Sequence, residues 1–302
     1  MGRMAASYPS AAAAGRATGA TIDPMDDRED ARAAIRARLA RELAAPEPEI
    51  PLARVALLLA AYERPGLDPA PALAELDAYA ERVRAHGDEL DPPDRRLETL
   101  HDVLYRDAGF RAPTAAESGD PDDSRLDRVL ERRVGLPISL AVVELEVADR
   151  VGLTLWGVGL PGHFVLGGPD GLLVDPAGGG RRLTPDDCQA LIRRAVGERV
   201  LFHSGMLRPM GTRGILARIL RNLRSAHLGR RDWPGALGAL DLLAVVEPTD
   251  PAHDRDRGLL LGRLGRFSEG IDLLRRYLET QPDAADAGDV RQVVGIFVGR
   301  RN

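Results

Sequence analysis

The chain has 302 residues, of which 44% are hydrophobic and 29% charged, a composition typical of a folded globular protein. The net charge is −5, every basic residue is arginine, and acidic residues alternate with the arginines, so no surface for nucleic acid is expected. One cysteine, Cys188, excludes an intramolecular disulfide and a multi-cysteine zinc site, and it fits a reducing compartment. No apolar run is long enough to span a membrane. We therefore predict a cytoplasmic protein that binds neither nucleic acid nor membrane.

The first third of the chain predicts a helical support. Residues 1–22 are rich in alanine, serine and glycine and lack the apolar segment of a secretory signal, so we predict a disordered lead-in over residues 1–27. Apolar residues then recur at spacings of three and four, the pattern of amphipathic helices. The predicted helices cover residues 30–43, 55–62, 71–86 and 93–108. Residues 111–123 are polar, acidic and rich in turn formers, which predicts a surface loop.

A central helix and three strands follow. Pro137 suits the first turn of a helix that runs to Val151 and carries an unusually apolar surface. The strands are predicted at residues 154–160, 163–166 and 171–174. Their connections are too short for helical crossovers, so the sheet is predicted to be antiparallel. Residues 178–182, three glycines and two arginines, lack the other features of a phosphate-binding loop and are predicted to form a flexible turn.

The remainder is predicted to be helical. Thr184 caps a helix over residues 185–196 that contains Cys188, which we expect to be a buried small hydrophobic residue. From about Arg213, similar residues recur 34 positions apart, including Trp233 and Phe267, which is the period of a tetratricopeptide-type repeat. Two repeats are fewer than a stable array needs, so they are expected to pack on the preceding domain and on a last apolar helix over residues 290–298.

Three residues in the central part have the chemistry of a catalytic site. His163 begins the second strand and Asp175 ends the third, so their side chains can become neighbours across an antiparallel hairpin, and the aspartate would then orient the imidazole. Ser139 stands near the start of the central helix, where the positive end of the helix dipole stabilises developing negative charge. A structural hydrogen bond and an ordinary first-turn serine explain the same residues equally simply. The histidines show no metal-ligand spacing, so we predict no metal and no cofactor.

The sequence strongly resembles the SirB-type bacterial transglutaminase-like proteins with a C-terminal tetratricopeptide tail. The resemblance spans about residues 50–295. It rests on LETLHDVLYRDAGF, RRVGLPISLAVVELEVADRVGL, GVGLPGHFVL, LLVDP and HDRDRGLLLGRLGRFSEGIDLL. It implies a core related to papain-like cysteine enzymes, in which a helix packed on an antiparallel sheet presents a nucleophile opposite a histidine and an aspartate.

Carried over residue by residue, the resemblance assigns the histidine to His163 and the aspartate to Asp175. The nucleophile does not carry over. Enzymes of the wider superfamily have a cysteine at the start of the helix, whereas the matching position here is near Pro137, with Ser139 two residues beyond. Family members generally share this absence. Two smaller departures are Asp123, where the family usually has asparagine, and Ala177, where it usually has an aromatic residue.

Three functional hypotheses follow. The first is a non-catalytic scaffold that binds a protein or peptide through the repeat region or a cleft beside His163, since acyl transfer in these enzymes depends on a thiolate. The second is an amide or ester hydrolase or acyltransferase in which Ser139 is the nucleophile, His163 the base and Asp175 the orienting group. The third is a structural subunit that acts through the repeats alone. We prefer the first and expect no enzyme activity.

The predicted fold class is α+β. A helical N-terminal support precedes a transglutaminase-like core, a helix on a small antiparallel sheet, and tetratricopeptide-type helices follow. The predicted boundaries place the transglutaminase-like domain with its N-terminal helices at residues 28–200 and the repeat region at residues 201–302.

Overall fold

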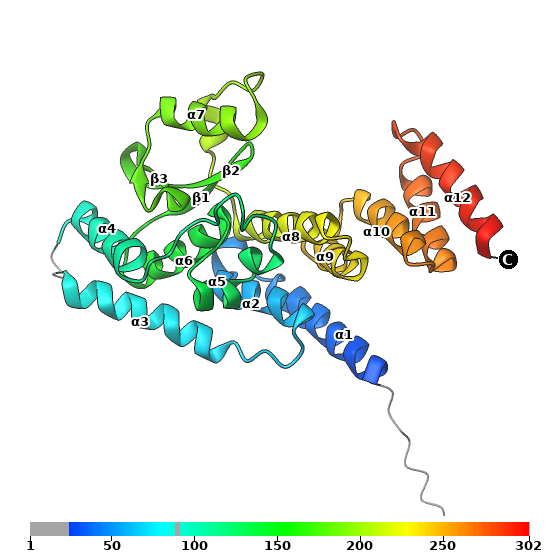
Figure 1. The fold of residues 1–302 in the computed structure, drawn as a ribbon, viewed down its shortest axis with the longest axis horizontal. Helices are drawn as coiled ribbons and strands as arrows, with labels where there is room; N and C mark the ends of the chain where they lie inside the picture. Colours follow the sequence, from blue (N-terminus) through cyan, green and yellow to red (C-terminus); the bar gives the residue numbers. More distant parts are fainter. Residues whose placement is uncertain (1–23, 88–90, 302) are drawn as a thin grey trace, which may run out of the picture.

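The structure, a computed structural model, describes residues 24–87 and 91–301 and consists of helices around one small sheet (Figure 1). Most of the predicted lead-in, residues 1–23, lies outside the described residues. The four predicted N-terminal helices are confirmed, although the first begins earlier than predicted. They are α1 (Pro24–Glu42), α2 (Leu52–Glu63), α3 (Ala70–His86) and α4 (Pro93–His101).

The end of α4 departs from the prediction of one regular helix. From Asp102 to Asp107 the chain continues as a π-helical turn, closed by a hydrogen bond from the Ala108 N–H to the Val103 carbonyl (3.0 Å). A π-helical turn widens the helix by one residue and is frequent at functional sites.

The loop over residues 111–123 is exposed as predicted along most of its length, but the prediction is wrong for its end. A 3₁₀ turn at Pro121–Ser124 buries Asp123 completely. The Asp123 carbonyl accepts the Leu136 N–H (2.9 Å), and its carboxylate accepts a hydrogen bond from Arg132 (3.1 Å). Burial raises the pKa of the Asp123 carboxyl. The turn thus ties helix α5 (Leu126–Arg132) to the start of helix α6 (Pro137–Arg150).

The sheet is antiparallel, as predicted, with its strands in the order β1-β2-β3-β4. A Pro161-Gly162 turn joins the first two strands, and Gly162 has the positive φ of 70° that this tight turn requires. The fourth strand was predicted as a turn, because two exposed arginines carry no alternation of apolar and polar residues. The strands are β1 (Trp156–Leu160), β2 (His163–Gly167), β3 (Leu173–Asp175) and β4 (Arg181–Arg182).

Two helices cover opposite faces of this sheet (Figure 1). Phe164, Leu166 and Val174 belong to the main hydrophobic core, which includes the apolar residues of α6. Val165 packs instead in a smaller cluster with Cys188 of helix α7 (Pro185–Val196). Alternate residues of a strand point to opposite faces, so β2 contributes to both layers. The predicted Thr184 cap of α7 is confirmed as a reciprocal capping box with Asp187.

The C-terminal helices form the predicted repeat. They are α8 (Thr212–Gly229), α9 (Trp233–Val246), α10 (Ala252–Arg263), α11 (Phe267–Thr280) and α12 (Ala287–Arg301). Successive helices pack as antiparallel neighbours, and α12 covers α11 as expected. None of the helices in the described part of the chain is both long and apolar enough to cross a membrane.

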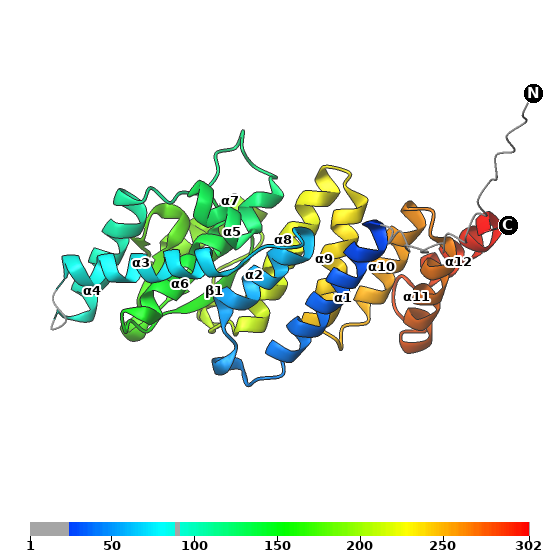
Figure 2. The ribbon, with the colours of Figure 1, turned by 90° about the horizontal axis from the view of Figure 1, so that it is seen from below.

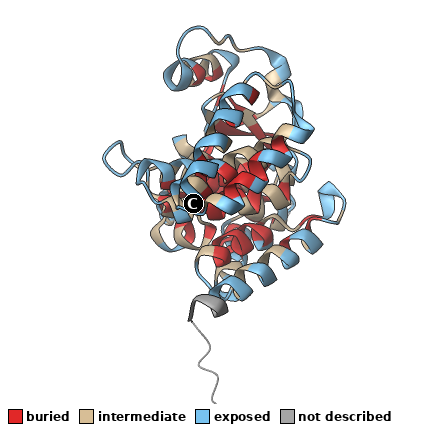
Figure 3. Cartoon of the chain, turned by 90° about the vertical axis from the view of Figure 1, so that its right-hand side faces the viewer, coloured by how far each residue is buried: buried red, intermediate tan, exposed pale blue. Residues whose placement is uncertain are grey.

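The repeat helices share a core with the N-terminal helices. Helix α1 lies along α9, and α2 contacts both α8 and α9 (Figure 2). Buried residues such as Leu39 of α1, Leu220 of α8 and Leu240 of α9 belong to one continuous cluster, and the buried residues gather in the middle of the molecule (Figure 3). The domain boundary between residues 200 and 201 therefore remains a prediction, since one hydrophobic core includes residues from both sides of it.

A buried histidine joins the repeat to the N-terminal helices. His227 of α8 is 4% exposed, and its Nε2 lies 2.9 Å from Oε1 of Glu63 at the end of α2, while its Nδ1 lies 2.7 Å from Oδ2 of Asp232. Burial alone would lower the pKa of His227, but the hydrogen bonds and charges of Glu63 and Asp232 outweigh it and raise the pKa above its usual 6.5. The protonated imidazole thus stabilises this contact.

This pKa shift predicts a pH dependence of stability. Because the folded-state pKa is raised, the stabilisation is complete below about pH 6.5 and is lost as the pH rises through the folded-state pKa. We expect the free energy of unfolding of the native protein, measured with urea at pH 6 and pH 8.5, to fall more than that of His227→Gln. Equal falls in the two proteins would show that His227 does not carry the effect.

Candidate functional site

His163 and Asp175 form a hydrogen-bonded pair, as their positions in the sequence suggest. The register that pairs Leu166 with Val174, continued by one residue, places Asp175 opposite Val165 and diagonally across from His163 on the same face. His163 Nε2 lies 3.0 Å from Asp175 Oδ1. Both side chains are largely buried, with 15% of the imidazole and 7% of the carboxylate exposed. If Nε2 carries the proton, Nδ1 is the nitrogen left to accept one.

The backbone around this pair is held on both sides. Asp175 Oδ1 also accepts the N–H of Ala177 (3.1 Å), which lies in the short 3₁₀ turn Pro176–Gly178 after β3. Arg218 of α8 donates to the carbonyls of His163 (2.5 Å) and Leu160 (2.9 Å), and its guanidinium lies over the ring of Phe164. The first repeat helix therefore fixes the hairpin that carries His163, and the loop after β3 fixes Asp175.

Ser139 lies in the first turn of α6, and its side chain is closed from solvent. The residue is 2% exposed, and its Oγ has no hydrogen-bond partner among the described residues. Its N–H donates to the carbonyl of Leu136 (2.9 Å), and Pro137 has no N–H to offer. Two of the first three backbone positions of α6 therefore provide no free donor for an oxyanion.

The alternation of side chains along β2 and β3 indicates on which face of the sheet the His163–Asp175 pair lies. Phe164 packs in the core that contains α6, so its neighbours His163 and Val165 face the other side of the sheet, toward Cys188 and α7. Asp175 shares this face by the register of β2 and β3. The structure therefore brings two of the three predicted site residues together and forms no hydrogen bond from either of them to Ser139 Oγ.

Cys188 is not a substitute nucleophile. It is fully buried in the cluster between the sheet and α7, as predicted. Burial raises the pKa of its thiol, with a smaller contribution from the negative charges of Asp187 and Asp175. A buried thiol with a raised pKa is poorly nucleophilic.

A second polar cluster, which the sequence analysis missed, is centred on Glu144 of α6. Glu144 is fully buried, and its Oε1 lies 2.9 Å from Nε2 of His101 while its Oε2 accepts a hydrogen bond from the hydroxyl of Tyr105. Burial and the adjacent carboxylate raise the pKa of Tyr105 well above its usual value, so its hydroxyl stays protonated and donates. The one sequence signal for this cluster was the position of a charged residue, Glu144, among the apolar residues of the central helix.

This cluster borders a cavity of about 910 Å³ between α4 and the glycine loop 178–180. The ring of His101 lies against Gly180, where an added Cβ would come within 2.4 Å of the imidazole. Gly180 also has a positive φ of 80°. The loop that was predicted as a flexible turn therefore closes tightly over His101. The charged residues around this cavity are largely paired with one another, as in the pair of Arg106 with Asp102 (2.7 Å).

A groove of about 840 Å³ runs across the junction of the sheet, α6 and the first repeat helix. Its apolar lining includes Trp156 of β1 and Met210, whose N–H is bonded to the carbonyl of Gly157 (2.8 Å). Acidic residues outnumber basic ones around it. The acidic residues are Glu47, Glu49, Asp77, Glu146 and Asp149, and the basic ones are Arg54 and Arg150.

Comparison with known families accounts for both halves of the chain. The transglutaminase-like superfamily matches residues 70–221, half of the chain, including α6 and the whole sheet. The chain belongs to the transglutaminase-like superfamily. The tetratricopeptide repeat family matches residues 223–295 of this transglutaminase-like protein. The two matches meet at residues 221–223, about ten residues after the predicted start of the 34-residue period near Arg213.

Several curated relatives carry the name UPF0162 protein. A relative from Xylella fastidiosa (strain Temecula1) is 36% identical over 250 residues, which cover 80% of this chain and 88% of the relative. A Pseudomonas aeruginosa relative is 36% identical over 69% of this chain and 77% of its own length. YchA from Escherichia coli (strain K12) is 26% identical over 69% of this chain and 78% of its own length. No solved structure matches the chain.

Proposed function

We propose that this transglutaminase-like protein is a non-catalytic scaffold of the SirB type that binds a protein or peptide partner. The observation that carries the proposal is the burial of Ser139, the one residue with a hydroxyl group at the start of α6. Its Oγ is buried without a hydrogen-bond partner among the described residues, so neither His163 nor Asp175 is bonded to it. A serine hydroxyl needs an adjacent base to become a nucleophile. The His163–Asp175 bond then serves to hold the hairpin in register.

The junction groove is the partner site that we propose. It joins the transglutaminase-like domain to a repeat of a kind that commonly binds other proteins. Glu47 pairs with Arg213, and Asp77 and Glu146 both pair with Arg150. With Arg213 counted, the five carboxylates of the groove exceed its arginines by two, and this excess and the apolar wall favour an extended segment that carries apolar and basic side chains. Asp149 is exposed at its edge, where it can meet a basic residue of the partner.

A photo-cross-linking experiment tests this site. We expect benzoylphenylalanine at the exposed position Arg54, inside the groove, to give a covalent adduct with a defined partner in cells, and the added substitution Asp149→Arg to abolish the adduct. Benzoylphenylalanine at the exposed position Ala85 of α3, outside the groove, is the matched control. Adducts of equal yield from both positions, or adducts that survive Asp149→Arg, would contradict the proposed groove.

The second candidate function is an amide or ester hydrolase with Ser139, His163 and Asp175 as its triad. The observation that favours it is the 3.0 Å His163–Asp175 bond, which leaves Nδ1 of the imidazole available as a base. It requires α6 to move so that Ser139 reaches that nitrogen. It predicts that Ser139→Ala and His163→Ala each abolish a measurable hydrolytic activity.

A further inference from the structure

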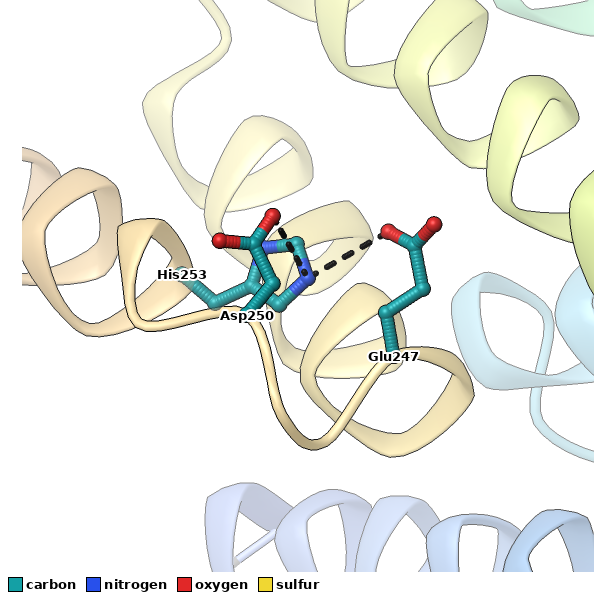
Figure 4. A group of neighbouring side chains, drawn as sticks. All are labelled: Glu247, Asp250 and His253. Carbon is teal, nitrogen blue, oxygen red and sulfur yellow. Dashed lines mark ion pairs between the residues drawn. The ribbon is translucent and has the colours of Figure 1, made fainter.

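The turn between the two repeats brings a histidine against two carboxylates. Glu247 directly follows α9, Asp250 lies in the turn, and His253 lies in the first turn of α10, so the three residues follow one another at intervals of three. One ligand atom from each lies within 4.8 Å of the other two. Figure 4 shows the imidazole directed between the two carboxylates.

The imidazole of His253 is buried, and one of its two nitrogens lacks a hydrogen bond. His253 is 6% exposed, and its Nε2 has no hydrogen-bond partner among the described residues. That nitrogen lies 3.4 Å from Glu247 Oε2 and 3.9 Å from Asp250 Oδ2. A direct charge-assisted hydrogen bond between an imidazolium and a carboxylate would be about 2.7–2.9 Å long. A buried nitrogen that faces two carboxylates at a greater distance therefore needs another partner.

We propose that Glu247, Asp250 and His253 bind a divalent transition-metal ion of the zinc class. In a tetrahedral zinc site with bonds of about 2.1 Å, neighbouring ligand atoms are about 3.4 Å apart. The distance from His253 Nε2 to Glu247 Oε2 has this value, and the distance to Asp250 requires an adjustment of only a few tenths of an ångström. A water molecule completes the fourth position. One nitrogen with two carboxylate oxygens suits zinc, cobalt or nickel better than magnesium or calcium, which prefer all-oxygen sites.

The surrounding contacts orient the two carboxylates. Arg221 of α8 donates to Glu247 Oε2 (2.6 Å), the same oxygen that faces His253, so the ion would bind to the second lone pair of this oxygen. The N–H of Ala252 donates to Asp250 Oδ1 (3.0 Å), which leaves Oδ2 directed toward His253. Ligating carboxylates are commonly hydrogen-bonded in this way by a second layer of residues. With a neutral imidazole, the charges of Glu247, Asp250 and Arg221 sum to −1, so a divalent cation is electrostatically favoured. The bound ion would fix the end of α9 to the start of α10.

The test is zinc binding by the untagged full-length protein after removal of bound metal with a chelator. Isothermal titration with zinc chloride is expected to show one site that saturates at one equivalent, and the ion is expected to raise the melting temperature. We expect His253→Gln to weaken binding by at least about tenfold, and Asp250→Asn, at a half-exposed position, to do the same. His86→Gln, at an exposed position of α3, is the matched control and should bind zinc as the native protein does.

Absence of zinc binding by the native protein would overturn the proposal. So would binding of unchanged affinity in both His253→Gln and Asp250→Asn. Circular dichroism of each variant shows whether its helices are intact, and Asp250→Asn keeps the test decisive if the buried His253→Gln does not fold. Cobalt provides a second readout. Cobalt bound in a tetrahedral site of the native protein should absorb visible light, and this absorption should be lost in His253→Gln and in Asp250→Asn.

Discussion

Replacement of Glu144 by alanine is expected to lower the free energy of unfolding by about 3 kcal/mol or more. Glu144 is fully buried and is the common partner of His101 and Tyr105, so its loss leaves two largely enclosed polar groups without an acceptor. It also leaves a cavity in α6, the helix that packs on the sheet. Urea unfolding followed by circular dichroism measures this change.

The matched control for Glu144 is Glu98→Ala. Glu98 lies in α4 beside the same cavity but is exposed, and its one ion pair among the described residues is with Arg95 (3.3 Å). Its removal should change stability by about 0.5 kcal/mol or less. Similar losses in Glu98→Ala and Glu144→Ala would mean that the buried cluster does not contribute more than a surface ion pair.

The second large effect is expected for Phe297→Ala in the last helix, by about 3 to 5 kcal/mol. The ring of Phe297 packs against Phe267 with centroids 5.4 Å apart, and it fills the space over Gly262, where an added Cβ would lie 1.8 Å from the ring. Because α12 packs mainly on α11, the loss should appear as local opening. Amide hydrogen exchange in α12 measures the local opening, and the unfolding transition measures the loss of overall stability.

The neighbouring residue provides the control for this prediction. Ile296 is 47% exposed on the same helix, so Ile296→Ala should leave both measurements nearly unchanged. Gly262→Ala should reproduce much of the Phe297→Ala effect, because the new methyl group displaces the ring. Retained protection of α12 in Phe297→Ala would show that the helix is held by other contacts.

The sequence predicted those features that depend on local chemistry or on a repeat. The Thr184 cap, the Pro137 helix start and the antiparallel hairpins follow from turn and capping residues alone. The repeat helices follow from a period of 34 residues, which relates Trp233 at the start of α9 to Phe267 at the start of α11. The contact between His163 and Asp175 was also predictable, because a short hairpin leaves few possible registers.

The features that the sequence did not predict depend on packing between distant segments. The face of the sheet that α6 covers decides whether Ser139 can meet His163, and spacing along the chain does not determine it. Glu144 lies 43 and 39 residues from its two partners, and the π-helical turn that carries Tyr105 has no recognisable pattern. Asp123 was assigned to a surface loop because its neighbours are acidic, whereas its bond to Arg132 allows it to be buried.

A non-catalytic scaffold should have no activated serine at position 139. Incubation of the native protein with a fluorophosphonate, which modifies activated serine hydroxyl groups, followed by mass spectrometry, measures this property without knowledge of a substrate. We expect no adduct at Ser139, as in Ser139→Ala, while a serine hydrolase in the same reaction is labelled. An adduct at Ser139 of the native protein that disappears in His163→Ala would contradict the scaffold and establish the triad.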